Sequence, residues 1–165
     1  MNFIETAMIS NSPEISKSLL DNLFEKNGEV LGVPVYRFEI DADTVAMVYD
    51  LVNAPNLPEE LLHHLLPHLH SVLIATDAGK NNLSVAHREK MDRLCHKFAG
   101  IPTTVAVLTE PERIKKLTIP VLNGLFLAEN SRIFLWHPDF PALKQHLWES
   151  LWLEKATGQT EDTTS

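Results

Sequence analysis

The chain contains a single cysteine, Cys95, among 165 residues. It therefore cannot form an intrachain disulfide or a cysteine-rich zinc site. Positive charge is also scarce, because 14 Lys and Arg stand against 22 Asp and Glu, for a formal net charge of −8. A chain this acidic is not expected to bind nucleic acid or a membrane through a polybasic patch.

Long apolar runs are missing as well. No run approaches the roughly 20 residues that a membrane-spanning helix needs, so no membrane insertion is expected. Glu5 interrupts the first apolar stretch, which argues against a signal peptide. These absences together favour a cytoplasmic protein.

What remains is an ordinary globular composition, with 44% hydrophobic and 22% charged residues. The length fits one domain, and neither an internal repeat nor a linker is visible. We predict a single domain over residues 1–155. The last ten residues, 156–165, read ATGQTEDTTS and are predicted to be a disordered polar tail.

Helix signals divide the chain at regular intervals. Ser12-Pro13-Glu14 combines a hydroxyl N-cap, a proline at the first helical position and an acid in the first turn. This helix is predicted to run to about Lys26 and to end at Asn27-Gly28. Further helices are predicted from the capping box that begins at Asn56 to Pro67, from about residue 84 to Gly100, and from about Asp139 to Lys155.

Six β-rich segments lie between these helices. They cover residues 3–10, 33–40, 44–52, 71–76, 103–108 and 132–136. Asp41-Ala42-Asp43 joins the second segment to the third as a tight hairpin, whereas most other strands alternate with helices. The pattern predicts an α/β fold of three layers: a doubly wound, mostly parallel six-stranded sheet with one antiparallel hairpin.

Residues 11–18, NSPEISKS, follow the first strand, where a phosphate-binding loop would read G-x-x-x-x-G-K-[ST]. Lys17 and Ser18 match, while Asn11 and Ser16 replace the two glycines. With the order of elements, this segment resembles the Ras-like small GTPases over residues 1 to about 153, and among them the bacterial gliding-motility GTPases. The resemblance implies the Ras-like P-loop fold.

The other nucleotide motifs of that family are altered too. Asn53-Ala54-Pro55-Asn56 stands where the family has D-x-x-G, and Leu57 replaces its water-orienting glutamine. Residues 27–33 contain no threonine to hold Mg²⁺. In place of the base-recognition motif N-K-x-D stands Thr109-Glu110-Pro111-Glu112. Of these residues, only Glu112 could accept hydrogen bonds from the edge of a guanine base.

Acidic residues now occupy the loops that would meet phosphate. Thr109-Glu110-Pro111-Glu112 has the spacing of a capping box and predicts a short helix or turn. Each acid thus lies near a predicted helix start, where it satisfies the helix dipole in place of an anion. We expect a vestigial nucleotide site of Lys17, Ser18 and Glu112, with no catalytic residue, no metal and no cofactor. The acids in question are Glu14, Glu59, Glu60, Glu110, Glu112 and Asp139.

The first hypothesis is a non-catalytic pseudo-GTPase that acts as a regulatory or protein-interaction module. Its resemblance to gliding-motility GTPases implies a roadblock-type (longin-like) partner or a homodimer. The alternative is a divergent small GTPase or switch that still binds nucleotide weakly through Lys17 and Ser18. In either case, Trp148 and Trp152 on the C-terminal helix are candidate interface anchors, or else they pack on the sheet.

Three other readings are weaker. A response-regulator receiver needs acidic residues where Ser10-Asn11 and Asn53 stand, and a serine hydrolase needs a G-x-S-x-G elbow, which is absent. Cys95 lies on the apolar face of its predicted helix and reads as a buried residue. A third hypothesis is a metal site in the group His63, His64, His68 and His70, although a surface helix end rich in imidazole is the simpler reading.

Overall fold

A computed structural model describes residues 1–10, 12–52, 59–77, 96–110, 112 and 132–161. Seven strands of these residues form one sheet in the order β2-β3-β4-β1-β5-β6-β7. Their bounds are β1 Asn2–Ser10, β2 Glu25–Val30, β3 Val33–Glu39, β4 Thr44–Val52, β5 Leu69–Asp77, β6 Thr103–Leu108 and β7 Arg132–Trp136.

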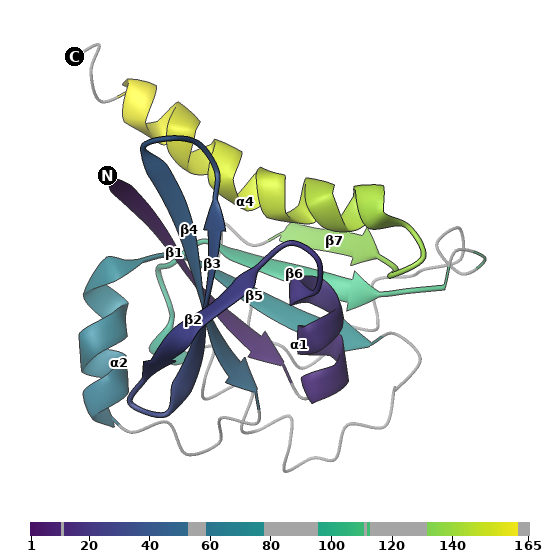
Figure 1. Ribbon diagram of the computed structural model, residues 1–165, viewed down its shortest axis with the longest axis horizontal. Helices are drawn as coiled ribbons and strands as arrows, with labels where there is room; N and C mark the ends of the chain where they lie inside the picture. Colours follow the sequence, from purple (N-terminus) through teal and green to yellow (C-terminus); the bar gives the residue numbers. More distant parts are fainter. Residues whose placement is uncertain (11, 53–58, 78–95, 111, 113–131, 162–165) are drawn as a thin grey trace.

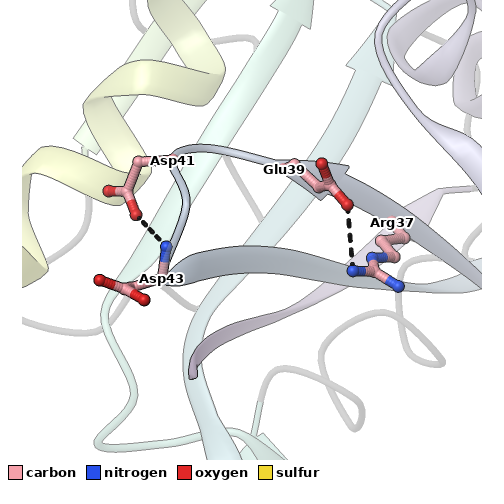
Figure 2. Close-up of polar contacts among 4 residues, drawn as sticks. All are labelled: Arg37, Glu39, Asp41 and Asp43. Carbon is pink, nitrogen blue, oxygen red and sulfur yellow. Dashed lines mark hydrogen bonds and ion pairs between the residues drawn. The ribbon is translucent and has the colours of Figure 1, made fainter.

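The central strand β1 is parallel to both of its neighbours, β4 and β5, and β6 and β7 continue in parallel. On the other side, β3 is antiparallel to β4, and β2 is antiparallel to β3. The predicted hairpin between residues 33–40 and 44–52 is therefore confirmed. In its turn, the Asp43 N–H donates to Asp41 Oδ1 at 2.8 Å, and Arg37 pairs with Glu39 beside it (Figure 2).

Helices cover both faces of the sheet (Figure 1). One hydrophobic cluster joins the sheet to α1 (Pro13–Leu20) and α4 (Pro141–Glu161). A second cluster, on the opposite face, joins it to α2 (Glu59–Leu65), which the short 3₁₀ helix η1 (Leu66–His68) follows. The three-layer, mostly parallel architecture predicted from the sequence is confirmed.

The first helix is shorter than predicted, and the sheet consequently has one strand more. Asp21 takes an extended ψ of 138° and Asn22 a φ of 66°, so the chain leaves the helix after Leu20. Asparagine tolerates this left-handed conformation better than most residues. Asn27-Gly28 does not end a helix but lies in β2, where the register shifts and Gly28 has φ 106°.

Leu31 and Gly32 form the turn between β2 and β3, with φ of 49° and 83°. A two-residue hairpin turn with positive φ at both positions follows the twist of its strands. Leucine at the first position is costly, because its Cβ crowds the backbone there. The sequence offered no strong signal for this hairpin.

The structure also places the end of the last helix elsewhere than the sequence predicted. α4 continues to Glu161, so it includes residues 156–161, which the sequence placed in a disordered tail. Most of the predicted helix from 84 to 100, with Cys95, lies outside the described residues, as do residues 53–58, with the capping-box residue Asn56. Phe98 is buried, and Gly100 has φ 90° in the turn that follows the helical residues 96–97, in agreement with the predicted helix end at Gly100.

Candidate functional site

The sheet brings the three residues of the predicted nucleotide site to one edge. Lys17 and Ser18 lie on α1, directly after β1, and Glu112 follows β6, whose carboxyl end points the same way. Ligands of open α/β sheets bind at this carboxyl edge. Lys17 and Glu112 are exposed and Ser18 is half-buried, while the motif position Asn53 and its neighbours to Leu57 lie outside the described residues.

The segment that would cradle a phosphate is largely helical. α1 begins at Pro13, inside the 11–18 motif, whereas a phosphate loop precedes its helix. Pro13 has no N–H, and the Ser16 N–H already donates to Ser12 O at 3.2 Å. A cradle needs several free N–H groups turned towards one anion. In this segment Pro13 supplies none, and the Ser16 N–H is already bonded within the chain.

Ser10 closes the turn before α1. Its hydroxyl donates to Ser12 O at 2.8 Å and accepts from the Ser12 N–H at 3.0 Å. Ser12, although it is the N-cap residue, makes no side-chain cap hydrogen bond. The Ser12 N–H, which a phosphate loop would offer to a ligand, is thus satisfied within the chain.

Behind this turn lies a carboxyl group that sequence reasoning missed. Asp50 extends from β4 beside Met8 of β1, and burial raises the pKa of its carboxyl to about 6. The Ser16 hydroxyl opposes this shift and lowers the pKa in part, although the two groups do not reach hydrogen-bond geometry. Ser16 stands at the second glycine position of the motif and is 1% exposed. The sequence signal that could have revealed this group is the single acid, Asp50, in the otherwise apolar run AMVYDLV.

Replacement of Asp50 by asparagine is expected to stabilise the fold above pH 6. The folded state binds the Asp50 proton more tightly than the unfolded state does, so ionisation between pH 4 and 6 reduces stability. The asparagine side chain cannot ionise, and the variant should gain about 1–2 kcal/mol at pH 7.5, after allowance for partial solvent screening.

Urea denaturation at pH 4, 5, 6 and 7.5 measures this gain, which should vanish at pH 4. Glu110→Gln removes an exposed charge at the same edge and serves as the control. An equal gain for Asp50→Asn at all four pH values would show that ionisation is not its cause.

α1 is joined to α4 by two buried side chains. Lys144 is 8% exposed, and its Nζ donates to Ser18 O at 3.1 Å and Asp21 O at 2.9 Å. Trp148 is 1% exposed, and its Nε1–H donates to Leu19 O at 3.0 Å. These contacts satisfy carbonyl groups at the end of α1, where the helix dipole favours a cation.

Trp148 is therefore a core residue and not the surface anchor that the sequence suggested as one reading. The broad apolar face of α4 packs against aromatic residues of the sheet and of the segment after α1. The Trp148 and Phe24 ring centroids lie 4.7 Å apart. Trp152 is half-buried and stacks on Phe38 at 5.0 Å with an interplanar angle of 14°. Neither indole stands out from the surface as a free anchor.

The four histidines of the predicted group separate into two environments. His70 Nδ1, on β5, accepts the Glu5 N–H at 2.9 Å. In turn, Glu5 accepts the Tyr49 hydroxyl at 2.6 Å, and burial, with the Glu5 carboxylate, raises the pKa of Tyr49. His63, His64 and His68 are exposed on α2 and η1. Within the described residues, no three His, Cys, Asp or Glu side chains gather closely enough to hold a metal ion.

Comparison with known proteins finds similarity in structure but not in sequence. The fold is similar to the Arl6 BBS3 small GTPase from Trypanosoma brucei, solved with a bound nucleotide analogue, GppNp. The TM-score is 0.55 at 10% identity, over 96% of this chain and 99% of that one. No family model and no curated protein sequence matches the chain. No helix of the described residues is long and apolar enough to cross a membrane.

Proposed function

The chain has the Ras-like small-GTPase fold, and we propose that it works as a nucleotide-independent, non-catalytic member of that fold. In this proposal it acts as a regulatory or protein-interaction module. The observation that carries the proposal is the start of α1 at Pro13, within the segment that would form the phosphate loop. The proline at this position and the bonded N–H groups of Ser12 and Ser16 leave fewer donors for a phosphate chain than a phosphate loop offers, which supports the proposal.

Electrostatics supports the same proposal. The Asp50 carboxyl lies beneath the first turns of α1, and with a pKa of about 6 it is mainly ionised at pH 7. Glu14 is exposed on the first turn itself. Two carboxylates close to the helix start oppose a triphosphate, and exposed Lys17 supplies one compensating charge. Hydrolysis would need, in addition, a residue that orients water, and Leu57 cannot do so.

Isothermal titration calorimetry with GTP, GDP and ATP, each with Mg²⁺, tests the proposal. We expect no binding at nucleotide concentrations up to about 1 mM, which corresponds to less than about 4 kcal/mol of binding free energy. Micromolar affinity that Lys17→Ala abolishes would contradict it and would favour the alternative, a divergent GTPase that uses Lys17 and Ser18. Lys97→Ala, at an exposed lysine away from α1, is the matched control.

We further propose that the functional partner is another protein, either of the roadblock (longin-like) type or a second copy of this chain. The resemblance to gliding-motility GTPases supports this. Sedimentation equilibrium at several concentrations separates a homodimer from a monomer. For a monomer, titration with a purified roadblock protein should give the same affinity with and without GTP. A GTP-dependent affinity would contradict nucleotide independence.

A further inference from the structure

Two exposed histidines face one another where α2 passes into η1. His64 lies in the last turn of α2 and His68 at the end of η1, and their ring centroids are 6.5 Å apart with an interplanar angle of 65°. Both side chains are exposed to solvent. His68 belongs to a 3₁₀ turn with about three residues per turn, so α-helical spacing does not apply across this junction. The ring contact itself shows that the two side chains lie together.

The distance between the two imidazole rings is close to that of a pair of histidines that bind one metal ion. With metal–nitrogen bonds of about 2.1 Å, two imidazoles on one tetrahedral ion have ring centroids about 5 Å apart. The observed 6.5 Å exceeds this by an amount that rotation of two exposed side chains removes. Pro67, which lies between the two histidines in η1, limits backbone motion there and leaves the adjustment to the side chains.

We propose that His64 and His68 form a two-ligand site for a divalent transition metal ion. Imidazole nitrogen favours Zn²⁺ and Ni²⁺, whereas Mg²⁺ takes oxygen ligands. The described residues provide no third protein ligand there, and in this proposal water or a second molecule fills the remaining coordination positions. The site lies next to the start of β5, at the end of the sheet opposite Lys17.

The two neighbouring histidines, His63 and His70, allow a control for the contribution of the His64–His68 pair. His63 is exposed on α2 but one residue away from His64, so it points about 100° around the helix from this pair. His70 Nδ1 is engaged with the Glu5 N–H. His63→Ala is therefore a matched control that removes one surface imidazole and leaves the pair intact.

Calorimetric titration of the untagged chain with Zn²⁺ and Ni²⁺ tests the proposal, with Mg²⁺ as the negative control. His64→Ala and His68→Ala should each weaken Zn²⁺ binding by about tenfold or more, because loss of a direct ligand exceeds the 10-fold loss seen for weaker outer-shell changes. His63→Ala should leave the affinity unchanged. Zn²⁺ should also raise the melting temperature of the wild type and not of the double variant.

The results of these titrations support or overturn the proposed metal site as follows. One ion per chain supports a site completed by water, and one ion per two chains supports completion by the same pair of a second copy. An equal loss of affinity in His63→Ala would overturn the proposal, since binding would then be an unspecific property of surface imidazoles. Absence of Zn²⁺ binding by the wild type would overturn it as well. Circular dichroism of each variant confirms that these exposed substitutions leave the fold intact.

Discussion

Replacement of Trp148 by alanine is expected to lower the free energy of unfolding by about 3–5 kcal/mol, the range for large aromatic side chains removed from a core. Trp148 is 1% exposed and packs against Phe24 with ring centroids 4.7 Å apart. The substitution also leaves Leu19 O without its indole donor. For a domain of this size, the melting temperature should fall by about 10 °C, which thermal denaturation followed by circular dichroism measures.

Two further variants separate the causes. Trp148→Phe keeps most of the buried ring and removes the Nε1–H bond to Leu19 O, so it should cost about 1–2 kcal/mol. Trp152→Ala removes a half-buried ring that stacks on Phe38 and should cost less than Trp148→Ala. If Trp152→Ala were the more damaging of the two, the assignment of Trp148 to the centre of the α1–α4 contact would be wrong.

Substitution of Lys144 by methionine is expected to cost about 2–3 kcal/mol, because it removes two charge-assisted hydrogen bonds. Methionine retains an unbranched apolar side chain and lacks the ammonium group that contacts Ser18 O and Asp21 O. The loss leaves two carbonyl groups at the end of α1 unsatisfied and removes a cation from the negative end of the helix dipole. Urea denaturation at pH 7 measures the change.

Lys97→Met provides the matched control, since Lys97 is exposed and its replacement should change stability by less than about 0.5 kcal/mol. Equal effects at positions 97 and 144 would mean that the two carbonyl contacts contribute nothing measurable. Lys144→Arg keeps the charge but changes the shape of the donor, and we expect it to recover only part of the loss.

The sequence was informative where a pattern had one physical meaning. Runs such as TTVAVL at 103–108 and the hairpin at Asp41-Ala42-Asp43 appear as predicted, because buried strands and Asx turns depend on local residues. The order of elements then determined the three-layer fold. Six of the seven strands of the described residues were predicted on this basis.

Local patterns failed where two conformations suited the same residues. Leu23 and Phe24 continue the apolar spacing of α1, yet Phe24 reaches the same core cluster from a chain that has already left the helix at Asp21. Asn27-Gly28 suits a helix end as well as a strand bulge. Only the pairing of β2 with β3, a tertiary contact, decides between them.

Sequence reasoning could place the candidate residues on the fold but could not give the contacts around them. The motif alignment placed Lys17 and Glu112 at the carboxyl edge, where the fold puts them. It could not show that Asp50 from β4 lies behind Ser16, or that Lys144 reaches the end of α1. Lys144 and Ser18 are separated by 126 residues in sequence, so no local pattern relates them.

The register shift in β2 bears on how the protein behaves at high concentration. An outermost strand offers a row of unused peptide groups that can recruit further strands and start fibrillar growth. Here that strand has a register shift near Gly28, and its residues before Val30, Glu25-Lys26-Asn27-Gly28-Glu29, are polar or glycine and exposed. An irregular, charged edge strand of this kind disfavours pairing with a strand of another molecule. We therefore expect no aggregation through β2, even at high protein concentration.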